Sequence, residues 1–435
     1  MLVGAGVRRV AIIGGIRIPF ARAHGAYATL SNQVMLTKTL GALVTRFGVH
    51  GMRLGEVAAG AVMKHPKDFN LVRECVLDSG LHPQTPALDL QRACGTSLEA
   101  AILIANKIAL GQIDAGIAGG VDSVSDPPLV YPRIYQQLLL RAYRASSTWS
   151  RLKPFFGLRA QHFKPEFPNA NEPHTKLSMG ESCERMAQQW GITRADQDQL
   201  ALESHLRAAQ AWRTGFFDDL VVDCNGLKQD DNLRADSSLA KLARLEPSFD
   251  HSLRGTLTAG NSSTLTDGAS SVLLASEAWA HMHGLPVLAY LTFGKAWAVD
   301  FANSPEGLLM APAYAIPAML RDAQLNLTDF DYYEIHEAFA AQVLCTLKAW
   351  ESPDFCAKQL GLPIVLGSID RTKLNVCGSS LALGHPFAAT GTRILSTLAK
   401  ILTNQHNVGG KIRRGLISVC TAGGMGVTAI LESAI

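Results

Sequence analysis

Apolar positions along the 435-residue chain alternate between short continuous runs and helically spaced sets. Runs of strand length occupy residues 10–13, 115–118 and 416–419. From Leu98 to Ala109, apolar side chains recur at the three- and four-residue spacing of a helix that buries one face. This alternation predicts an α/β fold, built from βαβ units around a mostly parallel sheet.

Two stretches share one pattern, in which a reactive side chain starts a helix and a glycine pair follows the next strand. In the first stretch, Cys94 precedes a helix that stops at Gly111, and the pair is Gly119-Gly120. The second stretch has the same landmarks at His385, Gly409-Gly410 and Gly423-Gly424. The pattern favours a duplicated α/β half, although glycine-punctuated βαβ units resemble one another even without duplication.

Residues 127 to about 254 break this rhythm and are richer in proline, arginine, asparagine and aspartate. We interpret them as an insertion whose later part, from Cys183 to Phe217, has a helical period. The predicted organisation is an N-terminal half of residues 1–126 plus 255–290, an inserted domain of residues 127–254, and a C-terminal half of residues 291–435.

Within the insertion, residues 129–164 carry only basic charges. Apolar side chains, among them Trp149, Phe155 and Phe156, alternate with the cations, and no aspartate or glutamate occurs. The cations are Arg133, Arg141, Arg144, Arg151, Lys153, Arg159 and Lys164. A solvated helical excursion or a subunit contact is the favoured interpretation. The alternative is a cationic amphipathic surface that touches a membrane or the phosphates of a ligand.

Composition excludes several classes of protein. With 47% hydrophobic and 18% charged residues, the chain can bury a large core. A net charge of +3 gives no argument for binding nucleic acid. The eight cysteines form no CxxC pair, which argues against zinc and favours free thiols in the cytoplasm. We expect neither a signal peptide nor a membrane-spanning helix.

Two cysteines, Cys94 and Cys420, lie at element ends where a thiol can react with a bound ligand. Cys94 precedes a helix, and there the helix dipole and free backbone N–H groups lower a thiol pKa and can hold an oxyanion. Cys420 follows an apolar strand and enters a loop with Gly423 and Gly424, where small residues let a ligand approach the backbone. Either residue could instead be an ordinary buried thiol.

Two histidines add acid–base capacity. His336 precedes Glu337 but lacks the second histidine of a zinc protease motif. His385, between Gly384 and Pro386, lies at a predicted helix start, where its near-neutral pKa suits a general base or its ring caps the helix. Together, the two cysteines and two histidines indicate a covalent thioester mechanism, because strand and helix ends converge on ligand sites in α/β sheets.

These motifs, in this order, resemble the thiolase family, and the resemblance spans nearly the whole chain. The His336-Glu-Ala-Phe form is similar to the β-subunit of the fatty-acid oxidation trifunctional complex and its bacterial relatives. The matching segments are Arg17-Ile-Pro-Phe, the Cys94 segment, Thr258-Ala-Gly-Asn-Ser-Ser-Thr-Leu-Thr-Asp-Gly, His336-Glu-Ala-Phe-Ala, Gly384-His-Pro-Phe-Ala-Ala-Thr-Gly and Cys420-Thr-Ala-Gly-Gly-Met-Gly.

The resemblance implies a five-layered αβαβα fold, made of two related βαβαβαββ halves with an inserted loop domain that covers CoA. It also implies a homodimer or homotetramer with no metal or organic cofactor. Cys94 would be the acylated nucleophile, His385 its activator and Cys420 the second acid/base. His336 and His385 would hold the thioester oxygen, and the backbone N–H groups of Cys94 and Ala422 would form a second oxyanion hole.

Contacts with CoA follow from the same resemblance. Arg234 matches a position near the nucleotide, and Phe339 matches one near the thioester. Met179, Phe249 and Ser263 match positions along the pantetheine path. The alternative for the two phenylalanines is ordinary core packing.

The expected function is a degradative 3-ketoacyl-CoA thiolase of fatty-acid β-oxidation. Ser178 stands where many short-chain biosynthetic thiolases have histidine, which argues mildly against an acetyl-CoA C-acetyltransferase, the first alternative. A condensing ketosynthase lacks a second catalytic cysteine such as Cys420. An alternative of another class is a thiolase-fold scaffold in a membrane-associated complex. The trifunctional resemblance implies an α-subunit with hydratase and dehydrogenase activities, and a membrane contact through residues 129–164.

Overall fold

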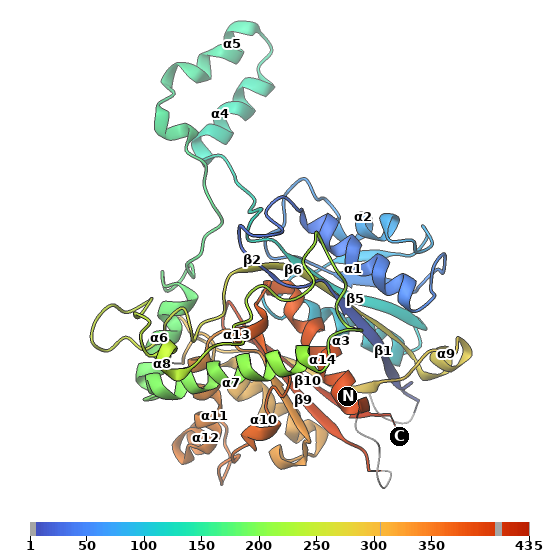
Figure 1. Ribbon diagram of the computed structural model, residues 1–435. Coiled ribbons are helices and arrows are strands. Elements are labelled where there is room, and N and C mark those ends of the chain that lie inside the picture. Colours follow the sequence, from blue (N-terminus) through green and yellow to red (C-terminus); the bar gives the residue numbers. More distant parts are fainter. Residues whose placement is uncertain (1–5, 305, 405–410, 435) are drawn as a thin grey trace.

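The computed structural model describes residues 6–304, 306–404 and 411–434. Its strands form a mixed sheet in the order β4-β3-β5-β6-β1-β7-β10-β9-β8, and β2 pairs with β6 (Figure 1). The strands are β1 Val10–Arg17, β2 Ala21–Arg22, β3 Glu56–Ala59, β4 Ala87–Asp89, β5 Ala115–Asp122, β6 Thr266–Ser276, β7 Ala289–Ala298, β8 Tyr332–Ile335, β9 Arg414–Thr421 and β10 Met425–Ser433.

The sheet consists of two halves joined by a short seam. Strand β1 of the N-terminal half pairs with β7 of the C-terminal half only where Ala11 faces Tyr290 and Ile12 faces Ala289. By contrast, β7 pairs with β10 along the whole length of β10. Each half is therefore a sheet in its own right, and the seam fixes one half against the other.

Strand directions differ from the expected mostly parallel sheet, and that prediction is wrong. Only β3 with β4, β3 with β5, and β8 with β9 are parallel among the described strand pairs. The pairs that involve β1, β6, β7 and β10 are antiparallel. Antiparallel neighbours need no crossover helix, so the short turn at Gly423 and Gly424 suffices to join β9 to β10.

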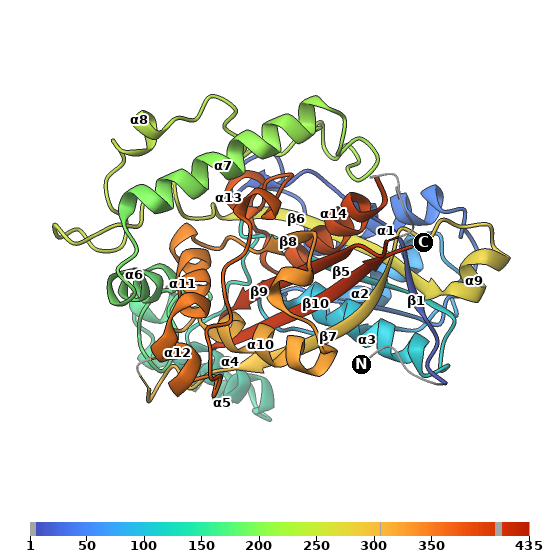
Figure 2. The ribbon, with the colours of Figure 1, turned by 90° about the horizontal axis from the view of Figure 1, so that it is seen from below.

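Helices on the sheet faces produce the five expected layers. Helices α1 Asn32–Arg46 and α2 Leu71–Asp78 cover the outer face of the N-terminal half. Helices α10 Ala311–Ala323 and α11 Ala340–Glu351 share a core with the C-terminal half. Helices α3 Thr96–Ala109 and α14 Thr390–Asn404 pack against each other between the halves (Figure 2). The predicted α/β fold, with helices on the sheet faces and between the halves, is therefore present.

The middle layer is packed tightly. A Cβ atom added at Gly391 of α14 would lie 2.3 Å from the backbone nitrogen of Leu98 in α3. The Thr392 backbone N–H also donates to Ser97 Oγ at 2.9 Å, which ties the two helix starts together. Cys94 and His385 precede these two helices, so the close crossing positions the candidate reactive groups relative to each other.

The chain between β5 and β6 contains the predicted insertion. Helices α6 Met179–Gln189 and α7 Arg194–Arg213 occupy the segment expected to be helical and lie against α11 and α13. The predicted domain boundaries stay a prediction. The remaining helices are α4 Arg133–Arg144, α5 Thr148–Leu152, α8 Leu239–Leu242, α9 Glu277–Met282, α12 Pro353–Lys358 and α13 Ser380–Leu383.

Residues 129–164, here called the arm, project from the body on two extended segments (Figure 1). The segments pair where the backbone N–H of Val130 donates to Glu166 and that of Glu166 donates back to Val130, at 3.1 and 2.8 Å. Helices α4 and α5 bury none of their residues. Within the described ranges, no helix is long and apolar enough to cross a membrane.

The glycine landmarks are only partly where the sequence pattern predicted them. Gly423 and Gly424 do follow β9, with φ of +78° and +68° that suit glycine. Gly119 and Gly120 lie inside β5 instead of after it. Position 120 requires glycine because a Cβ there would lie 2.0 Å from the Ala388 carbonyl oxygen. The predicted helix stop at Gly409-Gly410 lies outside the described residues.

Candidate active site

Cys94 lies in a strained turn between β4 and α3. Ala93 has φ of +44°, a conformation that non-glycine residues rarely adopt and that clusters at functional sites. Thr96 Oγ1 accepts from the Arg92 backbone N–H at 2.8 Å and donates to the Ala93 carbonyl at 2.7 Å. These bonds hold the turn, so Cys94 is partly exposed just before α3.

His385 forms a hydrogen-bonded pair with Cys94. Its Nε2 lies 3.1 Å from Cys94 Sγ, and its Nδ1 lies 2.6 Å from Thr390 Oγ1. The His385 backbone N–H donates to Thr266 Oγ1 at 2.8 Å, and Gly384 before it has φ of +99°. His385 therefore does not cap a helix: it lies in the turn before α14, oriented from both ring nitrogens.

The ionisation of the pair is set mainly by burial. Burial, followed by the Arg393 charge, lowers the pKa of His385 to about 3. Burial raises the pKa of Cys94 to about 12, even though the backbone N–H groups of Ala422 and Cys94 face the sulfur and lower it. The expected lowering of the thiol pKa is therefore wrong for this structure, because desolvation outweighs the helix start. Both shifts favour a neutral thiol and a neutral imidazole in the resting pair.

His336 completes the cluster from the end of β8. Its backbone N–H donates to the Ser418 carbonyl at 2.8 Å, and its Nδ1 lies 2.8 Å from Ser380 Oγ. The His336 and His385 ring centroids are 4.1 Å apart. Burial, the His385 ring and Arg393 keep the pKa of His336 well below its ordinary value. His336 Nε2 is buried without a hydrogen-bond partner.

Cys420 is buried in β9, one residue before the strand ends. Burial and the neighbouring Cys94 thiol raise its pKa well above the ordinary value. The two cysteines therefore share one electrostatic environment, in which neither is a thiolate until a proton is taken from it.

The predicted oxyanion groups also meet here. The backbone N–H groups of Cys94 and Ala422 both act on the Cys94 sulfur. Ala422 is thus brought beside Cys94 from the far end of the sequence. Donors aimed at the nucleophile are well placed for charge that develops next to it.

Several residues of the site carried no prediction. Glu337 accepts hydrogen bonds from Ser204 Oγ at 2.7 Å, Asn375 Nδ2 at 2.6 Å and the Leu381 backbone N–H at 3.2 Å. It thereby fastens α7 to the loops that carry the histidines. Ser380 and Thr390 contact the two imidazoles directly. Their hydroxyl groups flank the glycine-bounded His385 motif in sequence, which was the available hint.

The predicted CoA contacts fall into two groups. Met179 and Phe249 pack on the core cluster that contains Phe339 and Cys420, and the Phe249 and Phe339 rings are 6.0 Å apart. The Ser263 backbone N–H donates to the Ala338 carbonyl, next to Phe339, at 2.9 Å. These four predicted residues therefore belong to, or adjoin, the core cluster that contains Cys420.

Arg234 lies apart from that group. It is exposed, and its backbone N–H donates to His205 Nδ1 at 3.2 Å. Burial and the charges of Arg234 and Arg22 lower the pKa of His205 to about 4, so the ring stays neutral beside the cation. An exposed arginine outside the reaction centre suits the nucleotide end of a long ligand.

The donor atoms of Cys94, His336 and His385 lie within 4.8 Å of one another, a set that could hold a metal ion. However, the Cys94 sulfur and the His385 nitrogen already lie at hydrogen-bond distance, which suits proton transfer. The expectation that no cofactor is required stays a prediction.

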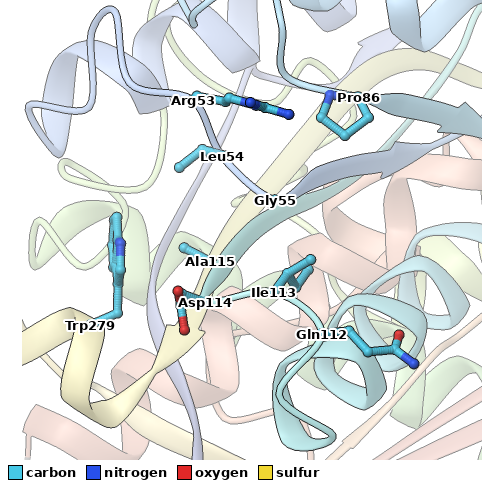
Figure 3. A pocket seen from close by; sticks show the side chains of 9 residues that line it. All are labelled: Arg53, Leu54, Gly55, Pro86, Gln112, Ile113, Asp114, Ala115 and Trp279. Carbon is cyan, nitrogen blue, oxygen red and sulfur yellow. The ribbon is translucent and has the colours of Figure 1, made fainter.

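A cavity of about 370 Å³ lies away from this cluster (Figure 3). Arg53, Gly55 and Ala115 line it, at the start of β3 and of β5, whereas Cys94 follows the opposite end of the parallel strand β4. Ligands of parallel sheets bind at the carboxyl ends of strands. Asp114, also in the lining, is already paired with Arg8 at 2.6 Å, so the cavity offers no comparable chemistry.

Comparison with known proteins agrees with the geometry. Residues 10–278 match the family described as thiolase, N-terminal domain, and residues 289–433 match thiolase, C-terminal domain. The chain belongs to the thiolase family. The resemblance found in the sequence is thereby confirmed for both halves of this thiolase.

Relatives in bacteria cover almost the whole thiolase chain. The 3-ketoacyl-CoA thiolases of Yersinia pestis (strain Pestoides F) and Yersinia pseudotuberculosis serotype O:1b (strain IP 31758) are each 38% identical over 430 residues. Each alignment covers 98% of this chain and 97% of the relative.

Solved structures agree at the level of the fold. The Bacillus anthracis acetyl-CoA acetyltransferase matches with a TM-score of 0.81 and 30% identity, covering 99% of this chain and 100% of that one. Human mitochondrial 3-ketoacyl-CoA thiolase in complex with CoA matches with a TM-score of 0.80 and 26% identity, covering 98% of each chain.

Proposed function

We propose that this thiolase cleaves 3-ketoacyl-CoA with free CoA, giving acetyl-CoA and an acyl-CoA shortened by two carbons. The observation that supports it most directly is the 3.1 Å contact between Cys94 Sγ and His385 Nε2, beside His336 and Cys420. The relatives in Yersinia carry the name of this activity. Reaction through an acyl-enzyme predicts ping-pong kinetics.

The first half-reaction breaks a carbon–carbon bond. His385 takes the Cys94 proton, and the sulfur attacks the 3-keto carbon of the substrate. The bond between carbons 2 and 3 then breaks, leaving acyl-Cys94 and the enolate of acetyl-CoA. His336 and the protonated His385 stabilise the enolate oxygen, and Cys420 donates its proton to carbon 2 to release acetyl-CoA.

The second half-reaction transfers the acyl group. The Cys420 thiolate takes the proton of the CoA thiol, and the CoA sulfur attacks the carbonyl carbon of acyl-Cys94. The backbone N–H groups of Cys94 and Ala422 stabilise the resulting oxyanion. As the bond to Cys94 breaks, its sulfur recovers the proton held by His385, and both cysteines return to their starting state.

Chain length separates this function from the first alternative. The structural match to an acetyl-CoA acetyltransferase favours keeping acetoacetyl-CoA chemistry as the second candidate. The test is the CoA-dependent loss of magnesium–enolate absorbance with substrates of four to sixteen carbons, with Cys94→Ala as the blank. Cleavage that rises with chain length supports the degradative enzyme. Activity on the four-carbon substrate alone assigns the acetyltransferase, and no cleavage at all leaves the scaffold alternative.

The proposal extends to assembly and compartment. We place the enzyme in the cytoplasm, since its eight cysteines are free thiols. We expect a homodimer or homotetramer, together with an α-subunit that carries hydratase and dehydrogenase activities and supplies the 3-ketoacyl-CoA. Gel filtration with such a subunit tests the assembly, and separate elution at micromolar concentrations argues against it.

The arm supports a peripheral membrane contact. It exposes Tyr143, Trp149 and Phe156, at 86%, 67% and 73% of their accessible surface, beside cations and without any acidic side chain. Basic amphipathic segments with exposed aromatic rings bind anionic bilayer surfaces. Neither α4 nor α5 buries a residue, and their main contacts with other described elements are with neighbouring parts of the arm.

A further inference from the structure

A buried arginine lies behind the two imidazoles. Arg393 of α14 is 1% exposed, although it carries a full charge. Its Nη2 donates to Ser380 Oγ at 2.7 Å, and its Nη1 donates to Ser379 Oγ at 3.2 Å. Burial lowers the pKa of Arg393 to about 10, and the carboxyl groups of Glu334, Glu337 and Asp230 favour its charged form. Arg393 therefore reaches the reaction centre through two adjacent serines and not by direct contact with either histidine.

The hydrogen-bond inventory of Ser380 assigns a direction to these contacts. Its hydroxyl group has two hydrogen-bond contacts in the described part of the chain, Arg393 Nη2 and His336 Nδ1. Arginine can only donate, so Ser380 Oγ is the acceptor there. Among the described contacts, His336 Nδ1 is the one acceptor that its single hydrogen can reach, so the buried hydroxyl is fully satisfied only when it donates to that nitrogen. A neutral imidazole that accepts at Nδ1 carries its proton on Nε2.

The resulting Nε2–H group is the hydrogen-bond donor that the enolate oxygen needs. His336 Nε2 is buried without a partner, and the ring lies 4.1 Å from that of His385 beside Cys94. A preorganised N–H donor that is buried and makes no hydrogen bond within the described protein is well placed to stabilise an enolate oxygen. The opposite tautomer would present a lone pair to that oxygen and repel it.

His385 has the opposite requirement and an opposite environment. Its Nε2 must accept the Cys94 proton, so its own proton belongs on Nδ1, where Thr390 Oγ1 can accept it at 2.6 Å. Thr390, unlike Ser380, has no contact with the Arg393 guanidinium among the described hydrogen bonds. The contacts therefore favour opposite tautomers for the two neighbouring histidines, because only His336 contacts a serine hydroxyl that already accepts a hydrogen bond from an arginine.

We infer that Ser380 and Arg393 are positioning residues that fix His336 as an Nε2–H donor for the enolate oxygen. This inference rests on the proposed function. Under this inference, the Ser380 hydroxyl group affects the reaction rate through His336, without touching the substrate. It also predicts that the adjacent Ser379, which binds the same arginine but not His336, has no such consequence.

The test compares Ser380→Ala with Ser379→Ala. Both serines are fully buried and each accepts one hydrogen bond from Arg393. Each hydroxyl group also has one further contact, Ser379 with the Ile335 carbonyl at 3.4 Å and Ser380 with His336 Nδ1, so the two variants lose similar packing and equal numbers of bonds. We expect Ser380→Ala to lower kcat by about 10- to 100-fold with KM within about twofold, since losing an oxyanion donor outright costs about 100- to 1000-fold. Ser379→Ala should keep kcat within about threefold of wild type. Ser380→Thr, which keeps the hydroxyl group, should restore most of the rate.

A second measurement does not depend on turnover. Nitrogen-15 NMR of histidine-labelled protein, with the His336 resonances identified by their loss in His336→Asn, reports which ring nitrogen carries the proton. The inference requires Nε2–H in wild type and loss of that single tautomer in Ser380→Ala. An Nδ1–H tautomer in wild type, or equal kcat values for the two alanine variants, overturns it. Failure of wild type to cleave any 3-ketoacyl-CoA contradicts the proposed function instead, and the NMR result still decides the tautomer.

Discussion

The reaction centre buries its functional side chains, whereas the arm exposes those that distinguish it. At the centre, Cys420, His336 and His385 are buried, and burial moves each pKa far from its ordinary value. In the arm, α4 and α5 bury no residue, and aromatic rings and cations face solvent together. The fold itself therefore positions the reactive groups at the centre, whereas the exposed side chains of the arm can be covered only by another molecule or a membrane.

The largest expected effect is at the nucleophile. Cys94→Ala should reduce thiolysis by at least about 1000-fold, because no other group can form the acyl-enzyme. The free energy of unfolding should change by less than about 1 kcal/mol, since Cys94 is partly exposed. Steady-state kinetics and urea unfolding measure the two quantities. Cys75→Ala, which removes a buried thiol from α2, is the control that should retain activity; thiolysis by Cys94→Ala at a tenth of the wild-type rate would contradict the assignment.

The next effect separates the arm from the centre. Trp149→Ser with Phe156→Ser should weaken binding to anionic phospholipid vesicles by about tenfold or more, because each exposed ring contributes about 1 kcal/mol or more at a membrane surface. Thiolysis of soluble substrates should not change. Vesicle co-sedimentation measures the binding, and Phe69→Ser, which removes an even more exposed ring outside the arm, is the control. If the wild-type protein does not co-sediment with the vesicles at low salt, the proposed membrane contact is wrong.

Packing offers a smaller and purely structural contrast. Gly391→Ala should lower the free energy of unfolding by about 1–3 kcal/mol, because the added Cβ would overlap the Leu98 backbone where α14 crosses α3. Gly157→Ala in the arm meets no atom within 4 Å and should stay within about 0.5 kcal/mol of wild type. Urea unfolding gives both values. Equal stability of the two variants would show that the middle layer accommodates an added methyl group, contrary to the close helix crossing in the structure.

The smallest expected effect is in the pH profile. Because the pKa of His385 is lowered to about 3, its base form is fully present above about pH 5, and protonation near the ordinary value should not reduce activity. The kcat/KM for 3-ketoacyl-CoA should therefore stay nearly constant between about pH 5.5 and 7.5, a range of about one unit on each side of the usual histidine value. An acid limb with an apparent pKa of about 6.5 would show that His385 is more solvated than the geometry indicates.

The sequence predicted which residues form the reaction centre, but not how their surroundings change their pKa or orient them. Cys94, His336, His385 and Cys420 were found because motif and element ends coincide, and the structure brings them together. The lowered thiol pKa was wrong, since a helix start is visible in sequence but desolvation is not. Ser380 and Arg393 went unassigned because their role depends on side-chain contacts with His336 that no spacing encodes.

The same division holds for the fold. Helices and strands followed from periodicity, and the five layers followed from the family resemblance. Strand direction did not, because β6 returns after the long insertion and pairs antiparallel with both β1 and β5. Pairing of this kind is set by contacts far apart in the chain. The glycine pair in β5 was likewise placed by its packing against Ala388 and not by a turn.

The central claim, acyl transfer through Cys94, is tested most directly by trapping the intermediate. Mass spectrometry of protein mixed with 3-ketohexadecanoyl-CoA, without free CoA, should show one tetradecanoyl group per chain, mapped by proteolysis to the peptide that contains Cys94. Addition of CoA should remove it as tetradecanoyl-CoA. Absence of any adduct, or an adduct that maps to Cys420, would contradict the account.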